Sequence, residues 1–209
     1  DSFLGQYRWS EATPPHGPPL VATATAIDID GQDHFIDNVI VFSARVGIEL
    51  KGGASILSNT HVYGDSNDEP GPTSGPALVV SGASVHALGD YFDGKPVVLI
   101  DPMQVEVAHC FFLGAIGVEL RSSGAAAAAI NGLALRHNQF FAKAAQPPAV
   151  WLNESAGPFA SVRQARVEGN VFEGSAAGAA LANRATAASR TTTLAANATE
   201  AAFELAGAF

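Results

Sequence analysis

The chain is poor in cysteine and in charged residues. Its 209 residues include a single cysteine, which excludes an internal disulfide and gives no cysteine spacing typical of a metal cluster. Charged residues make up 15% of the chain, and 20 acidic against 11 basic residues give a net charge of −9. This charge disfavours nonspecific binding to nucleic acid or to anionic lipid, so we expect neither as a partner.

Long apolar runs and nucleotide-binding loops are also missing. No apolar stretch is long enough to span a membrane, and the start shows no cleavable signal. No Gly-rich phosphate loop precedes a helix, so nucleotide binding has no support. Two glycosylation sequons, at Asn153 and Asn197, fit a secreted protein. We expect no metal ion and no organic cofactor.

A repeat of about twenty residues dominates the chain. Each copy begins with a short strand whose predicted inward pairs are Ile27/Ile29, Ile48/Leu50, Leu78/Val80, Val98/Ile100, Val118/Leu120 and Val150/Leu152. A second strand has the inward residues Ile36, Leu57, Ala87, Val107, Leu135 and Val167. After a polar corner, a third strand has the inward residues Val41, Val62, Phe92, Phe112, Phe140 and Phe172.

Three short strands per copy, with like residues in register, predict an all-β chain folded as a right-handed, single-stranded parallel β-helix. Successive turns, or rungs, would lie about 4.8 Å apart, so that each residue stacks on its counterpart one rung away. The apolar columns would then form a core that no single rung could bury.

The clear copies cover residues 1–174, and we expect residues 175–209 to form a degraded last rung and a closing segment. The stretch "SFLG" (2–5) repeats the end of "CFFLG" (110–114), which predicts Phe3 in the register of Phe112. The chain would then begin midway around a rung, without an N-terminal cap. We therefore expect a preceding segment or a partner to cover the first rung.

The stretches "VIVFSARVGIELKGGASILSNTHVYG" (39–64), "LIDPMQVEVAHCFFLG" (99–114) and "TAIDIDGQDHFIDNV" (24–38) resemble the plant quartet-three-type polygalacturonases. The resemblance extends over residues 1–174 and corresponds to the C-terminal portion of a family member. It implies the pectin-lyase fold, secretion to the cell wall and hydrolysis of galacturonan. The usual polygalacturonase motifs Asn-Thr-Asp, Asp-Asp and Gly-His-Gly do not occur, and "GIELK" (47–51) keeps only the lysine of Arg-Ile-Lys.

Two outward columns on the first strands carry the candidate chemistry. One column is predicted to read Asp28, Glu49, Val79, Leu99, Glu119 and Trp151, and the other Asp30, Lys51, Ser81, Asp101, Arg121 and Asn153. Glycoside hydrolysis needs two carboxyl groups that flank the scissile bond. We therefore expect three catalytic acids, Asp28, Asp30 and Glu49, whose crowding would favour one protonated member.

The remaining polar members of the columns are candidate substrate-binding residues. Lys51 and Arg121 could hold uronate carboxylates, and Trp151 could stack on a sugar ring. Asp101 and Glu119 share the same face. A structural interpretation stays open, in which Asp30–Lys51 and Asp101–Arg121 are cross-strand ion pairs and Trp151 only packs.

Two other functions also stay open. One is a non-catalytic polysaccharide-binding or structural β-helix, and the other is a polysaccharide lyase that uses Ca²⁺ or a basic residue, Lys51 or Arg121. The acidic stretch 65–69 could offer oxygen ligands but fits a solvated turn better. His109 and His137, Asn138 and Asn170, and Cys110 are expected to stack at a corner of the helix rather than to act chemically.

Overall fold

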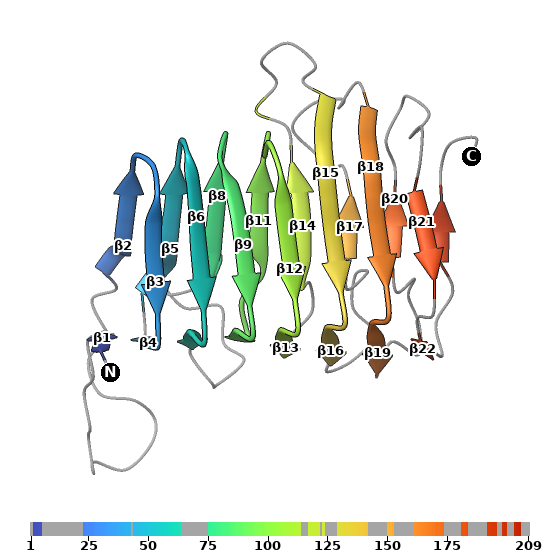
Figure 1. Ribbon diagram of the computed structural model, residues 1–209. Coiled ribbons are helices and arrows are strands. Elements are labelled where there is room, and N and C mark those ends of the chain that lie inside the picture. The colour runs from blue at the N-terminus through green and yellow to red at the C-terminus, as the bar shows by residue number, and fades with distance from the viewer. Residues whose placement is uncertain are drawn as a thin grey trace.

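The alternating apolar residues form short strands that wind into a parallel β-helix, as the computed structural model shows (Figure 1). The structure describes residues 2–5, 23–42, 44–63, 75–113, 117–121, 123, 129–141, 150–152, 161–173, 181–183, 192–195, 198–199 and 203–205. Every regular element in these residues is a strand, which confirms the predicted fold class. Among them there is also no helix with the length and apolarity needed to span a membrane.

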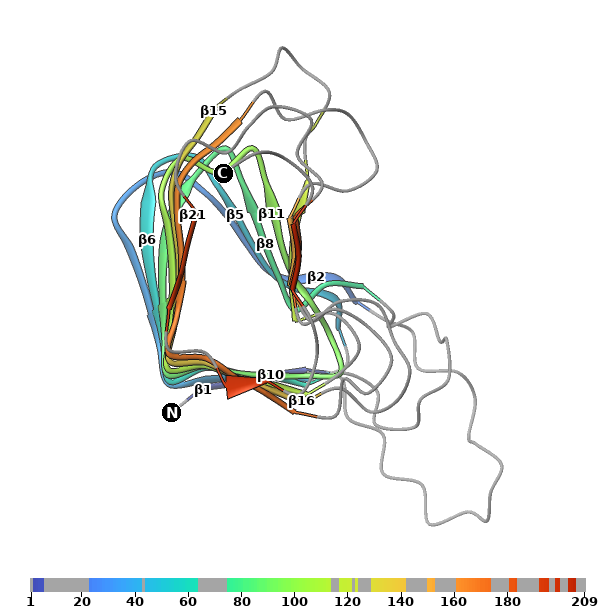
Figure 2. The ribbon, with the colours of Figure 1, turned by 90° about the vertical axis from the view of Figure 1, so that its right-hand side faces the viewer.

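Three parallel sheets form the walls of the helix, which enclose the core when viewed along the axis (Figure 2). Sheet 1 contains β2 (Thr23–Asp30), β5 (Ala44–Lys51), β8 (Leu78–Ser81), β11 (Val97–Ile100), β14 (Val118–Arg121), β17 (Val150–Leu152), β20 (Leu181–Asn183) and β23 (Phe203–Leu205). Sheet 2 contains β3 (His34–Asp37), β6 (Ala54–Ser58), β9 (Ser84–Leu88), β12 (Val105–Ala108), β15 (Ala129–Arg136), β18 (Ser161–Glu168) and β21 (Thr192–Ala195). Sheet 3 contains β1 (Ser2–Gly5), β4 (Val39–Phe42), β7 (His61–Tyr63), β10 (Tyr91–Asp93), β13 (Phe111–Leu113), β16 (Gln139–Phe141), β19 (Val171–Glu173) and β22 (Ala198–Thr199).

The core consists of the stacked inward columns. The predicted columns of sheets 2 and 3 are confirmed, because each member is the register partner of the next. In sheet 3 the rings of Phe92, Phe112, Phe140 and Phe172 stack with centroids 5.2, 4.6 and 4.8 Å apart. All four rings are buried, and each contributes about 2–3 kcal/mol of hydrophobic stabilisation.

The corner between sheets 2 and 3 is built from one left-handed residue per rung. These residues have φ between 50° and 69° and are Asn38, Asn59, Gly89, His109, His137 and Gly169. Glycine adopts this conformation without strain, and asparagine and histidine are enriched in it. The imidazole rings of His109 and His137 stack with centroids 5.2 Å apart, which confirms the predicted polar corner.

In every one of these rungs but the first, where Val39 follows Asn38, the residue after the left-handed position bonds backbone groups through its side chain. Asn138 accepts a hydrogen bond from the Cys110 amide at 2.9 Å, and Asn170 accepts one from the Asn138 amide at 2.9 Å. The predicted structural role of these asparagines is confirmed. Cys110 is buried in the same column, and this burial raises the pKa of its thiol to about 12.

One inward pair of the sequence prediction is wrong. In β11 the residues in register with the inward residues Val118 and Leu120 are Val97 and Leu99, whereas Val98 and Ile100 face outward. The strand reads Val-Val-Leu-Ile, so alternation alone cannot fix its register. Backbone bonds fix it instead, because the Val97 amide donates to the Gly117 carbonyl at 2.8 Å.

The first strand is shifted by one residue in the same way. Leu4 pairs with Val41 of the inward column, and Phe3 pairs with Ile40. Phe3 is therefore in the register of Phe111, not of Phe112 as predicted. At the other end β20, β21, β22 and β23 continue the three sheets beyond β19. The division of the chain at residue 174 stays a prediction.

Candidate functional site

The outer face of sheet 1 carries the predicted site in a corrected register. The first outward column reads Asp28, Glu49, Val79, Val98, Glu119 and Trp151. The second reads Asp30, Lys51, Ser81, Ile100 and Arg121. Charged groups therefore gather on β2 and β5 at one end of this face and on β14 further along it.

The first group is an acid cluster arranged around Lys51. The Lys51 Nζ atom donates to both carboxylate oxygens of Asp28, at 2.9 and 3.2 Å. It also lies 3.5 Å from Oε1 of Glu49 on its own strand. The hydrogen bond to Asp28 holds the pKa of the Lys51 ammonium above its usual value. Sheet geometry thus brings two of the predicted acids to one shared cation.

Asp30 takes a different position in this cluster. Its Cα is the register partner of Lys51, but the lysine ammonium turns diagonally to Asp28 instead. Asp30 is exposed and makes no ion pair with any residue that the structure describes. The predicted Asp30–Lys51 cross-strand ion pair is therefore wrong, and Asp30 is the acid of this cluster that is open to solvent.

The second group is a closed pair on β14. Arg121 donates from Nε to Oε1 of Glu119 at 2.7 Å and from Nη2 to Oε2 at 2.6 Å. The Glu119 side chain is only 6% exposed, whereas that of Arg121 is 43% exposed. Both carboxylate oxygens of Glu119 are thus engaged by one bidentate guanidinium.

The two groups are separated along the face. Lys51 and Arg121 are three rungs apart in one column, which corresponds to about 14 Å. Ser81 and Ile100 lie between them, beside the apolar Val79 and Val98 of the neighbouring column. Lys51 and Arg121 therefore belong to two separate clusters rather than to one binding site.

Asp101 does not join this face, contrary to the prediction. The register of β11 places it after the strand, in a turn with a φ of 44°. Its Oδ2 atom accepts a hydrogen bond from the Ser123 amide at 3.0 Å. The predicted Asp101–Arg121 ion pair is absent because Arg121 is bound to Glu119. Trp151 keeps its predicted column through its pairing with Glu119.

Other predicted features lie partly outside the described residues. The acidic stretch 65–69 and the sequon residues Asn153 and Asn197 fall there. Within the described part of the chain, no group of three or more His, Cys, Asp or Glu residues is placed to hold a metal ion.

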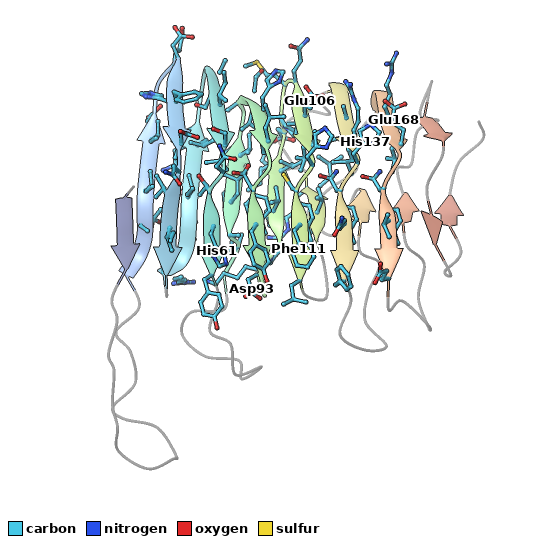
Figure 3. All side chains as sticks on the ribbon, turned by 60° about the horizontal axis from the view of Figure 1, so that its bottom comes forward. His61, Asp93, Glu106, Phe111, His137 and Glu168 are labelled. Atoms are coloured by element: carbon cyan, nitrogen blue, oxygen red, sulfur yellow. The ribbon has the colours of Figure 1, made fainter. Side chains whose placement is uncertain are left out.

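The sequence reasoning missed a second polar cluster, on the outer face of sheet 2. Glu106 lies 3.1 Å from Nδ1 of His86 and 3.2 Å from Nη2 of Arg136. Arg136 Nε in turn lies 3.5 Å from Glu168. The network therefore extends from β9 across β12 and β15 to β18, and its two carboxylates, Glu106 and Glu168, are labelled in Figure 3. The signal was present in the sequence, because these residues alternate with the inward residues of the second strands and must therefore share the outer face of sheet 2.

Comparison with curated proteins finds Polygalacturonase QRT3 of Arabidopsis thaliana, which is 30% identical to this chain over 175 residues. The aligned part covers 83% of this chain but 35% of that protein. The chain thus spans about a third of the length of the curated relative that it matches. No family model matches the chain, and no solved structure matches it.

Proposed function

Because this chain is a divergent homologue of Polygalacturonase QRT3, we propose that it is a secreted, wall-directed glycoside hydrolase that acts on galacturonan. The observation that carries the proposal is the acid cluster of sheet 1. It brings Asp28, Asp30 and Glu49 together on an open face of the same kind of β-helix that the resemblance implies. Galacturonan is the substrate class, and its cleavage by water needs no cofactor.

Within this proposal the three acids have different roles. A general acid must carry a proton, and a carboxyl beside an ammonium ion is poorly suited to hold one. Asp30 has no described ion pair and is the candidate proton donor to the glycosidic oxygen. Asp28 and Glu49 both contact the Lys51 ammonium, so they are the candidates to activate water.

The substrate-binding roles follow from the same contacts. Lys51 can bind a uronate carboxylate only by exchanging it for Asp28 or Glu49, and Arg121 only by opening its bidentate pair with Glu119. Trp151 is the candidate stacking residue beside Glu119. We retain Lys51, Glu119, Arg121 and Trp151 as candidate substrate contacts, and we do not retain Asp101.

The ion pairing of both cations favours one alternative, a non-catalytic β-helix that binds or supports polysaccharide. In that case the charges of sheet 1 stabilise the wall and perform no chemistry. The same pairing argues against a lyase, because a base that removes a proton must not itself be protonated and Lys51 is held as an ammonium ion.

Polygalacturonate cleavage by the chain tests the proposal. New reducing ends without the ultraviolet absorbance of unsaturated uronate would indicate hydrolysis, and Asp30→Asn and Glu49→Gln should each lower the rate at least about a hundredfold. Asp33→Asn is the matched control, because Asp33 is an exposed turn residue outside the sheet. A chain that releases no reducing ends, or that cleaves equally well with Asp30→Asn, would contradict the assignment.

A further inference from the structure

A groove of about 490 Å³ opens on the outer face of sheet 2. Sheet 2 forms a different wall of the helix from sheet 1, which carries the acid cluster (Figure 2). Its polar lining comes from sheet 2 and the turn before β12, and includes His86, Gln104, Glu106, Arg136 and Arg166. The volume falls in the range of about 300–1,000 Å³ that is typical of small-ligand sites.

The groove exists because short side chains interrupt a column of long ones. Ala134 is the register partner of Glu106 on one side and of Arg166 on the other. Gly132 and Ala134 have little or no side chain to project from the sheet, so a depression forms between the longer side chains of Glu106 and Arg166. Val105 and Leu133 point into the core below this depression. A flat ligand can therefore approach the strand backbones closely here.

The charges in the groove favour an anion. Arg166 is exposed and makes no ion pair with any residue in the described ranges, so its planar guanidinium can take a carboxylate in a bidentate manner. Glu106 does not oppose this, because its two oxygens face His86 and Arg136. Arg166 is therefore a local cation on a chain whose net charge is −9.

We propose that this groove is a second saccharide-binding site, which takes a carboxylated sugar unit on Arg166. Gln104 and the outer edge of the His86 ring provide hydrogen-bonding groups for ring hydroxyls. The preference for an anion rests on the charges, and the choice of a uronate rests on the proposed function. The groove would hold the polymer on sheet 2 while sheet 1 engages another stretch of it.

The test is a titration of the isotope-labelled chain with trigalacturonate, followed by backbone amide shifts. We expect saturable shifts at Gly132, Ala134 and Arg166 that the uncharged galactose trisaccharide does not produce. Arg166→Gln should weaken this binding about tenfold, since a charge-assisted contact is lost. Ala134→Leu should also weaken it, by filling the groove without changing the charge.

Arg45→Gln is the matched control, because it removes an exposed arginine of β5 outside the groove, and it should leave the shifts unchanged. Absence of shifts on sheet 2, or shifts that persist unchanged in Arg166→Gln, would overturn the inference. Failure of the proposed function would look different: no cleavage and no shifts at residues 28–51, with the sheet 2 shifts intact.

Discussion

Asn138 and Asn170, one rung apart at the corner of sheets 2 and 3, are joined by a hydrogen bond of 3.0 Å from Nδ2 of Asn138 to Oδ1 of Asn170. Each amide also donates to a backbone carbonyl of the preceding rung, Val107 and Leu135 respectively, at 2.9 Å. The side chains therefore form a ladder that satisfies buried polar groups from rung to rung.

Asp90 occupies the same ladder with a carboxyl in place of an amide. Its Oδ1 accepts from the Thr60 amide at 2.8 Å, but its Oδ2 is buried and has no hydrogen-bond partner. Burial raises the pKa of Asp90 to about 7, above the usual 3.8. The folded state therefore binds this proton more tightly than the unfolded state, and the stability from Asp90 falls as pH rises from about 4 through 7.

Asp90→Asn should stabilise the protein at pH 8 by on the order of 2 kcal/mol, because an amide can donate where Oδ2 has no partner. At pH 4 the gain should shrink, since Asp90 is then protonated in the folded state. Denaturation midpoints at both pH values measure the effect, with Asp33→Asn as the exposed control. An equal gain at both pH values would refute the role of the proton.

Phe140→Ala should lower the free energy of unfolding by about 3–5 kcal/mol. Its ring lies between those of Phe112 and Phe172 and is 2% exposed, so truncation leaves a cavity within the stack. Phe35→Ala is the control, because Phe35 is 66% exposed and should cost less than about 0.5 kcal/mol. Urea denaturation measures the free energy of unfolding of both variants. Similar losses would show that the stacked rings contribute no more to stability than an exposed phenylalanine.

Gly169→Ala should destabilise the chain more than Gly82→Ala. Both glycines have positive φ, near 64° and 60°, so each substitution carries a backbone cost of about 1 kcal/mol. Only at Gly169 would the new Cβ meet a neighbour, the ring of His137, whereas Gly82 faces open space. Thermal melting of the two variants measures the difference, which should diminish when His137→Ala is combined with Gly169→Ala.

Glu119→Gln should cost about 1 kcal/mol of stability, because its bidentate partner Arg121 is partly exposed and can turn to water. It should also tighten binding of polygalacturonate, since the guanidinium is released. A double-mutant cycle with Arg121→Gln isolates the pair energy. If Glu119→Gln leaves polymer retention unchanged, Arg121 is not a substrate contact.

The sequence predicted the stack well wherever polar and apolar residues alternate. Leu57, Ala87 and Val167 stand between polar or exposed neighbours and fall where their period places them. The prediction slipped by one residue at Val97–Ile100, where four apolar residues succeed one another and either register buries apolar side chains. That slip alone placed Asp101 on the wrong face.

The candidate site was predictable in its columns but not in its contacts. Strand register fixes that Asp28 lies beside Glu49, as the repeat predicts. The diagonal reach of Lys51 to Asp28 depends on side-chain rotamers, which no periodicity encodes. The groove on sheet 2 depends on the small volume of Ala134 between two long neighbours, so it becomes visible only when the outward columns of the second strands are written out.

The direction of the backbone hydrogen bonds should make the resistance of the molecule to force depend on the direction of that force. The covalent chain runs around the helix, whereas the bonds between rungs run along its axis, as the parallel pairings of all three sheets require. A pull along the axis would load only these weak bonds and the stacked rings, and the rungs would separate in succession. A compressive force across the axis would instead act on the covalent backbone of each rung, which resists it more strongly.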